Sequence, residues 1–303
     1  MAVIAVSSSA VLVRWADAPA EALAFWRTAG GALILAPAAH RSPTGPDRRQ
    51  WMAIVVAGGA LALHFSTWLA SLELTSVAAS VTLVTTAPLM IAIGAAIIGR
   101  RPPIRTWLAI LIAIAGVGVI TIGAPGAGGT GAGPSDPGLG NLLALIGAAA
   151  MALYLVAGDQ VRSTVSTAGY AARAYAVAAI GLAGYAGVTG LSLWGYDRQT
   201  WLAIVAMVLG PQLAGHTMLN LLLDRLGSVT VSTLLLAEPV GAGLLVWLLF
   251  GEVPPLAAWI GGPLVLGAVA LQLRTAHRPR PGRPAAPADG APVDRTPPVE
   301  PVS

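Results

Sequence analysis

The feature that most constrains this chain is a series of ten apolar segments, separated by short polar stretches, that covers almost its whole length. The segments lie at residues 1–13, 20–38, 51–70, 77–98, 105–123, 139–157, 168–193, 200–223, 229–250 and 256–275. Most of them reach the ~17 to 25 residues that an α-helix needs to cross the hydrocarbon core of a bilayer. The first segment is shorter than the others. The sequence therefore predicts an all-α membrane protein with about ten transmembrane helices.

The composition agrees with lipid as the surrounding solvent. Of the 303 residues, 56% are hydrophobic and 10% are charged, whereas a soluble domain carries about a quarter charged residues. The chain has no cysteine, which excludes disulfides and thiolate metal sites. Its net charge of +4 comes from arginines that lie mostly in short loops. That pattern sets membrane orientation and argues against nucleic-acid binding.

The distribution of arginines predicts the orientation of the helices. Cytoplasmic loops are enriched in basic residues, and ten helices place both termini on one side. With both termini in the cytoplasm, only Arg14 and Arg198 fall in outer loops. The inner loops then hold Arg41, Arg48, Arg49, Arg100, Arg101, Arg105, Arg162 and Arg225, and the tail adds five more. We therefore expect a multi-pass protein of the cell (cytoplasmic or inner) membrane.

The chain divides into two similar halves. A Gly/Pro-rich outer loop at 124–138 separates residues 1–123 from residues 139–275, and a Pro/Ala/Arg tail at 276–303 is expected to be disordered. Pro88 in VTTAPLM and Pro239 in LLAEPVG lie 151 positions apart. Five helices per half place the halves in opposite orientations, which predicts a 5+5 inverted-topology repeat. Secondary transporters are commonly built in this way, with the substrate site near the midplane between the repeats.

Several of these motifs resemble the EamA branch of the drug/metabolite transporter (DMT) superfamily. They are FWRT with Arg27, the LTSVAASVTLVTTAPL and NLLLDRLGSVTVSTLLLAEPVGA runs, and the closing FGEVPP with Glu252. The resemblance covers roughly residues 1–275, so that each half is identified as an EamA-type five-helix repeat. It implies cytoplasmic termini and alternating-access transport of metabolites or amino acids, often as export. Arg101 stands where many relatives carry a glutamate.

Glu238 is the candidate for coupling transport to a second event. It is predicted near the middle of a membrane helix, where a charged carboxylate is costly unless it is paired or faces water. Pro239, like Pro88, removes a backbone hydrogen bond and opens its helix locally, which makes both prolines candidate gating points. Glu238 is either a substrate-amine or proton site, or a protonated group that bonds the carbonyls freed at the kink.

Other polar residues within the helices are candidates for the wall of a cavity. His64 and His216 lie in the third helix of each half, where each either relays protons or packs as a hydrogen-bonded neutral ring. Gln212, His216 and Asn220 follow each other at a spacing of four, so this stripe must face protein or a water-filled cavity. The first half is expected to contribute Trp68, Thr85 and Thr86.

Two arginines lie within predicted helices. Arg27 and Arg173 bind an anionic substrate group, or reach the interface by snorkelling, or pair with an acid. For Arg173, near the expected cytoplasmic side, snorkelling or pairing with an acid is the favoured interpretation, whereas the role of Arg27 is left open. Glycines recur every third residue at Gly181, Gly184, Gly187 and Gly190, which predicts close helix packing.

The sequence thus favours a secondary active transporter, expected to be an exporter of small metabolites or amino acids, with no cofactor and no metal. Its expected partners are the small-molecule substrate, the lipid bilayer, protons as the candidate coupling ion and a second copy in a homodimer, without nucleic acid. An enzyme is not expected, since HExxH, GxSxG and the phosphate-binding P-loop are absent. Alternatives are a non-transporting membrane sensor or assembly partner and a membrane-embedded enzyme acting on lipid-linked substrates. A channel would need a continuous polar lining, which the sparse polar residues do not supply.

Overall fold

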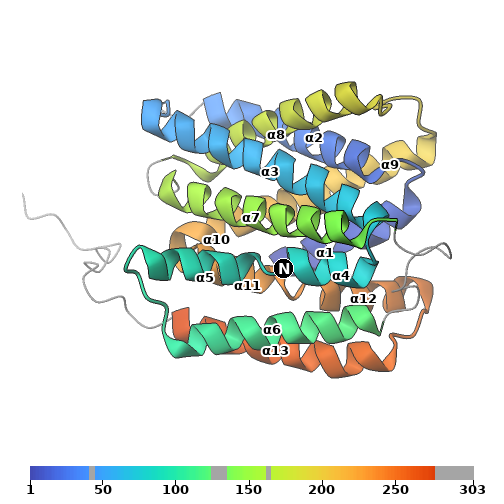
Figure 1. Ribbon diagram of the computed structural model, residues 1–303. Coiled ribbons are helices and arrows are strands. Elements are labelled where there is room, and N and C mark those ends of the chain that lie inside the picture. Colours follow the sequence, from blue (N-terminus) through green and yellow to red (C-terminus); the bar gives the residue numbers. More distant parts are fainter. Residues whose placement is uncertain (41–44, 124–134, 162–164, 277–303) are drawn as a thin grey trace, which may run out of the picture.

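In the computed structural model, which describes residues 1–40, 45–123, 135–161 and 165–276, every regular element of the described residues is a helix (Figure 1). In chain order these are α1 (Ala2–Trp15), α2 (Ala20–His40), α3 (Arg48–Leu74), α4 (Val77–Val84), α5 (Ala87–Ile97), α6 (Ile104–Ile122), α7 (Pro137–Val161), α8 (Thr167–Thr189), α9 (Arg198–Met207), the π-helix η1 (Val208–Thr217), α10 (Met218–Leu226), α11 (Ser228–Leu235), α12 (Glu238–Phe250) and α13 (Leu256–Ala276). The tail and most of the 124–138 loop lie outside the described residues.

Nine stretches of the described chain are long and apolar enough to cross a bilayer. Three of them join elements end to end: α4 with α5, α9 with η1 and α10, and α11 with α12. The remaining helix, α1, has 14 residues. At a rise of about 1.5 Å per residue it is shorter than the ~30 Å hydrocarbon core. The predicted all-α membrane fold is confirmed, with a short first helix.

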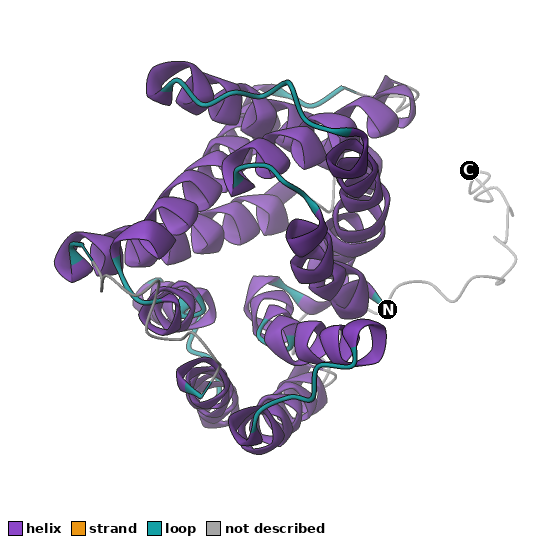
Figure 2. Cartoon of the chain, turned by 90° about the vertical axis from the view of Figure 1, so that its right-hand side faces the viewer, coloured by secondary structure: helices purple, strands orange, loops and turns teal. Residues whose placement is uncertain are grey.

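Contacts between the helices repeat in the way that a duplicated fold requires. If α1 to α6 are superimposed in order on α7 to α13, then α2 corresponds to α8, and α6 to α13. Both of these corresponding pairs are packed against each other, and α6 and α13 lie side by side along one edge (Figure 1). In the same scheme α3 packs on α7 as α1 packs on η1. Most helices cross the bundle in the same general direction in Figure 1, and Figure 2 shows the lower ones close to end-on and several of the upper ones obliquely.

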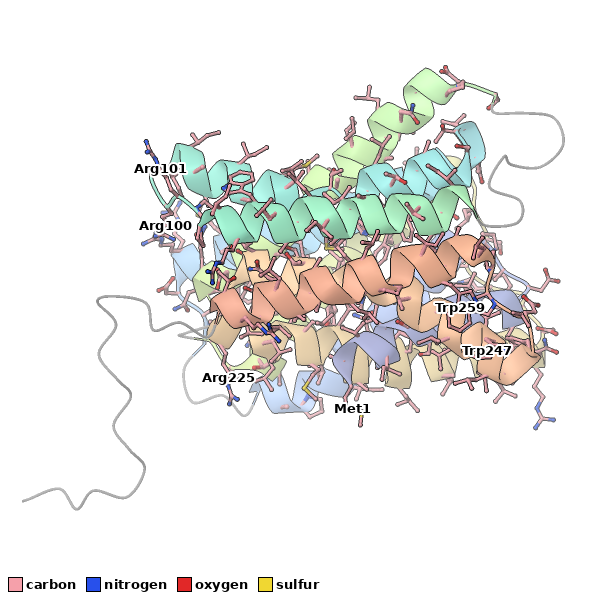
Figure 3. The ribbon with its side chains drawn as sticks, turned by 90° about the horizontal axis from the view of Figure 1, so that it is seen from below. Met1, Arg100, Arg101, Arg225, Trp247 and Trp259 are labelled. Atoms are coloured by element: carbon pink, nitrogen blue, oxygen red, sulfur yellow. The ribbon has the colours of Figure 1, made fainter. Side chains whose placement is uncertain are left out.

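The two ends of the bundle differ in their side chains. Arg100, Arg101 and Arg225 lie at one end, whereas Trp247 and Trp259 lie at the other (Figure 3). We call these the arginine end and the tryptophan end. Aromatic rings favour the membrane interface, and basic residues favour one side of it. Between the two ends the outer surface is apolar, with Leu33 of α2 and Ile180 of α8 largely exposed, as expected for side chains that face lipid.

Small residues let the helices approach closely, since lipid offers no hydrophobic drive for their association. A Cβ atom added at Gly58 of α3 would lie 2.6 Å from the carbonyl oxygen of Ala174 in α8. The expectation for the helix at 168–193 holds in part. A Cβ at Gly181 would meet Ala62, but Gly184 and Gly187 face open space and Gly190 ends α8 with φ +73°. The prediction of packing along that whole glycine row is therefore wrong, because most of the row points away from the neighbouring helices.

Two adjacent glycines of α3 provide a test of this packing. Replacing Gly58 with alanine should destabilise the protein by about 1–3 kcal/mol, since the added methyl overlaps the α8 backbone. Replacing Gly59, where a Cβ meets nothing within 4 Å, should be neutral or stabilise by up to ~1 kcal/mol through helix propensity. Unfolding of the purified protein in detergent measures both changes, and equal effects at the two positions would contradict the proposed α3–α8 contact.

Candidate functional site

The helix breaks lie at corresponding places in the two halves. The turn at Thr85–Thr86 separates α4 from α5, and the turn at Leu236–Ala237 separates α11 from α12. These turns are 151 positions apart, as are Pro88 and Pro239, which stand in the first turn of the helix after each break. Both prolines therefore fall where a helix restarts, since a proline at that position gives up no helical hydrogen bond.

Glu238 is the first residue of α12 and lies directly at the second break. Its side chain is half-buried, and its backbone carbonyl accepts a hydrogen bond of 3.0 Å from the Ser7 hydroxyl of α1. The corresponding residue of the first half is Ala87, which is buried and uncharged. The carboxylate therefore distinguishes one break from the other.

Arg27 provides the positive charge of the site. It lies within α2, its side chain is 8% exposed, and its Nε donates a hydrogen bond of 2.9 Å to Oε1 of Gln212. Its guanidinium carbon stands 5.5 Å from the centre of the Phe65 ring, in a cation–π arrangement. Arg27 also interacts electrostatically with Glu238.

The π-helix η1 places Gln212 and His216 beside α2. Pro211 lies inside this element, and a proline there cannot supply the usual amide donor to an α-helical ladder. The Thr217 hydroxyl donates to the Gln212 carbonyl five residues earlier, at 3.2 Å. The half-buried His216 side chain interacts electrostatically with Arg27 and His64. Such π-helical stretches occur frequently at functional sites.

A buried hydrogen-bond network continues from η1 into α10, α7 and α8. The Tyr154 hydroxyl of α7 donates to Oδ1 of Asn220 at 2.9 Å, and Nδ2 of Asn220 donates to the Tyr175 hydroxyl of α8 at 3.1 Å. Tyr175 in turn lies 3.4 Å from the Thr217 hydroxyl. Asn220 therefore joins three helices, which fixes the helix that carries Gln212 and His216.

His64 approaches the site from α3. Its Nδ1 atom lies 2.9 Å from the carbonyl oxygen of Gly147, and its ring stacks on Trp68 with the ring centres 5.6 Å apart. The indole Nε1 of Trp68 is buried without a hydrogen-bond partner. His64 is therefore held by protein groups on one side, and its ring lies within electrostatic range of Arg27.

The structure gathers most of the predicted residues and separates a few. Arg27 is hydrogen-bonded to Gln212 and lies within electrostatic range of His64, His216 and Glu238, and we call these five residues the central cluster. Thr85 and Thr86 instead donate hydrogen bonds to carbonyls of their own helix, Thr82 at 2.8 Å and Leu83 at 2.6 Å. They belong to the first break and have no recorded contact with the central cluster.

Three side chains of the site were not predicted from the sequence: Phe65, Tyr175 and Thr217. Tyr175 lies two residues from Arg173, and Thr217 directly follows His216. The charge of Arg173 and the imidazole of His216 marked those neighbours as candidates, whereas Tyr175 and Thr217 had no such mark in the sequence. Arg173, expected from the sequence to snorkel or to pair with an acid, contacts a backbone carbonyl and an aromatic ring instead. Its Nη1 donates 2.8 Å to the Gly169 carbonyl, and its guanidinium stands 5.6 Å over the Trp51 ring.

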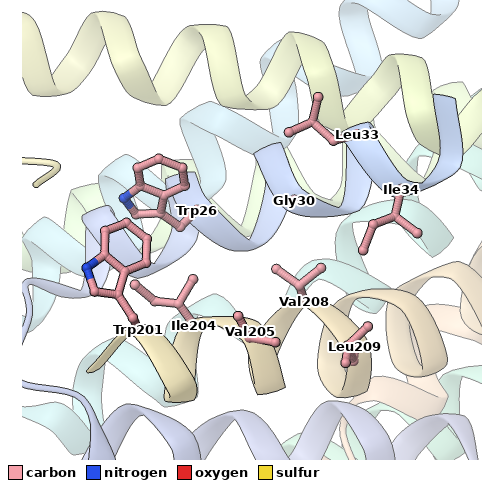
Figure 4. Close-up of a pocket in the computed structure, with 9 residues that line it drawn as sticks. All are labelled: Trp26, Gly30, Leu33, Ile34, Trp201, Ile204, Val205, Val208 and Leu209. Atoms are coloured by element: carbon pink, nitrogen blue, oxygen red, sulfur yellow. The ribbon is translucent and has the colours of Figure 1, made fainter. Parts of the chain in front are cut away.

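A separate groove of about 280 Å³ lies between α2 and the α9–η1 segment (Figure 4). It is apolar throughout and contains no member of the central cluster; its lining residues are Trp26, Gly30, Leu33, Ile34, Trp201, Ile204, Val205, Val208 and Leu209. Within the described residues no group of three or more His, Asp or Glu side chains could hold a metal ion. The groove therefore lacks the charged and polar side chains that the central cluster contains.

Comparison with known proteins provides the family of the chain. A sequence model of the EamA-like transporter family matches residues 1–122 and 138–274. No curated protein is similar enough to count as a match. One similar solved structure, titled "Crystal structure of protein", has 21% sequence identity and a TM-score of 0.74, and the alignment covers 91% of this chain and 96% of that one. At this identity the likeness concerns the fold.

Asn220 offers a test of the hydrogen-bond network. Asn220→Leu should lower the free energy of unfolding by about 1–3 kcal/mol, because two buried tyrosine hydroxyls lose a partner. Asn141→Leu is the matched control: Asn141 is half-buried near one end of α7 and accepts a single bond of 2.9 Å from Thr75, so its loss should be smaller. Denaturation of both variants in detergent makes the comparison, and a larger loss at Asn141 would contradict the central role of Asn220.

Proposed function

The chain belongs to the EamA-like transporter family, and on that premise we propose that it is a secondary active transporter that exports small metabolites or amino acids by alternating access. The observation that carries the proposal is the central cluster. Ionisable side chains inside a membrane bundle are costly and are retained mainly where they serve a substrate or ion pathway. Here they meet beside a helix break, between the two halves, which is where transporters with repeated halves bind their substrates.

Contacts of the broken helices support a two-state mechanism. Towards the arginine end α5 packs against α11, whereas towards the tryptophan end no comparable contact joins α4 and α12 in the described chain. By the pseudo-symmetry α4 corresponds to α11, and α5 to α12. Exchanging the conformations of the two halves would close the tryptophan end and open the arginine end. This geometry fits a transporter that exposes the central cluster to one side at a time.

We assign the arginine end to the cytoplasm, with both termini on that side of the cell membrane, because basic residues are retained there. The structure then corresponds to a state that is closed towards the cytoplasm. We propose export as the direction of transport because the family resemblance implies it. Glu238 is proposed as the residue that couples transport to protons. A carboxylate beside Arg27 can exist charged and paired, or protonated, and these two forms would favour different helix arrangements.

The orientation can be tested because the chain has no native cysteine. Ile104→Cys and Val253→Cys place single thiols at exposed, uncharged positions at the arginine and tryptophan ends. In intact cells a membrane-impermeant maleimide should label the Val253→Cys variant and spare Ile104→Cys until the membrane is permeabilised. The reverse pattern would invert the topology.

The transport proposal is tested by counterflow in proteoliposomes loaded with a pooled mixture of amino acids and metabolites. We expect labelled exchange of one compound class by the wild-type protein and its loss in Glu238→Ala. No exchange by folded protein, for any compound, would favour the non-transporting alternatives, a membrane sensor or assembly partner. Chemical conversion of a lipid-linked compound would instead favour an enzyme.

Proton coupling makes a sharper prediction for Glu238→Gln. The glutamine mimics the protonated carboxyl group, so exchange should persist while an imposed proton gradient no longer drives accumulation. Glu73→Gln, at an exposed helix end, should behave as wild type. Uphill accumulation by Glu238→Gln at the wild-type rate would exclude this residue as the proton carrier.

A further inference from the structure

The two arginines that lie within helices at similar places in each half have different surroundings. Arg173 is half-buried, and its guanidinium is engaged by the Gly169 carbonyl and by the face of Trp51. Arg27 is almost fully buried, at 8% exposure, yet one of its terminal nitrogens, Nη2, is buried and has no hydrogen-bond partner. Each guanidinium thus makes one hydrogen bond and one contact with an aromatic ring, but of the two only Arg27 keeps a buried terminal nitrogen without a partner.

An unmatched donor on a buried cation is expensive. Leaving a buried donor without an acceptor costs about 1–3 kcal/mol, and more when the group is charged. Gln212 holds the Nε edge of Arg27 at 2.9 Å, and Phe65 covers the guanidinium at 5.5 Å. These contacts fix the orientation of the group without consuming Nη2. The arrangement is that of a positioned receptor that lacks its acceptor.

The surroundings of Arg27 indicate which acceptor fits. Glu238 attracts the guanidinium through space, but no hydrogen bond joins the two side chains in the structure. The other ionisable groups that interact with Arg27 are His64, His216 and Tyr175. Arg27 is the single arginine of the central cluster, so the site has one permanent positive charge beside one carboxyl group. That balance suits a monoanion better than a phosphate dianion, and the planar guanidinium matches the geometry of a carboxylate.

We propose that Nη2 of Arg27 binds the carboxylate group of the transported molecule, with Gln212 holding the guanidinium in position. That the bound molecule is transported rests on the proposed function, whereas carboxylate binding by itself does not. Free carboxylic acids and zwitterionic α-amino acids share this chemistry. In the zwitterion, the ammonium group would additionally lie within the field of Glu238.

The experiment is a binding measurement on the full-length purified protein in detergent. Thermal unfolding is followed with a panel that pairs each small aliphatic carboxylate and each α-amino acid with its own primary amide, at equal ionic strength. At least one carboxylate should raise the unfolding midpoint, and its amide should not. Arg27→Gln should weaken the apparent affinity at least ~10-fold, as expected for loss of a charge-assisted pair. Arg173→Gln is the matched control and should bind as wild type.

Arg27→Lys keeps the proposal testable if Arg27→Gln does not fold. The lysine retains the charge but cannot hold Gln212 and a carboxylate in one planar group, so affinity should still fall ~10-fold. Unchanged affinity in either Arg27 variant, equal stabilisation by the amides, or no stabilisation by any carboxylate would overturn the proposal. Binding restricted to amino acids would identify the zwitterion as the ligand.

The outcome is distinct from that of the transport assay. Carboxylate binding that depends on Arg27, without exchange in proteoliposomes, would retain the site and reject the transporter. Exchange of compounds that lack a carboxylate, unaffected by Arg27→Lys, would retain the transporter and reject this site.

Discussion

The structure depends on one constraint: inside a bilayer, backbone N–H and C=O groups must be satisfied within the protein. Continuous helices meet this requirement along most of the described chain. The breaks before Ala87 and Glu238 interrupt the helical hydrogen bonds, and both lie inside the bundle, where other protein groups can bond the freed backbone. The Thr85 and Thr86 hydroxyls bond carbonyls at one break, and Ser7 bonds the Glu238 carbonyl at the other. Irregular backbone at membrane depth is tolerated only in such protected places.

The same constraint explains why polar side chains gather beside the second break. A polar atom that faced lipid would lose its hydrogen bonds, so the interior between the halves is where a charged group can be kept. Arg27, Gln212 and Glu238 come from three different helices but face this interior. The network through Asn220 and Tyr175 holds the π-helix that carries Gln212. α2 packs directly on η1, which brings Arg27 next to Gln212.

Duplication provided the scaffold, and divergence of the halves provided the chemistry. Glu238 corresponds to the buried Ala87, and Arg27 keeps a buried terminal nitrogen without a partner, whereas Arg173 does not. Two halves with identical residues would form two identical sites, related by the pseudo-two-fold symmetry. The divergence concentrates charge on one side instead, which gives a single asymmetric cluster.

The sequence by itself determined the helical membrane fold and the correspondence of the two halves, because the length of an apolar segment and the spacing of Pro88 and Pro239 are properties of the chain alone. It also marked Arg27, Gln212, His216 and Glu238, since polar residues are rare and costly in such segments. It could not foresee which atoms contact Arg27 and Arg173, or that Gly184 and Gly187 face open space. Those outcomes depend on which atoms of distant helices meet a side chain. Only the tertiary structure decided that Gln212 takes one edge of Arg27, that Phe65 covers it, and that Nη2 is left over.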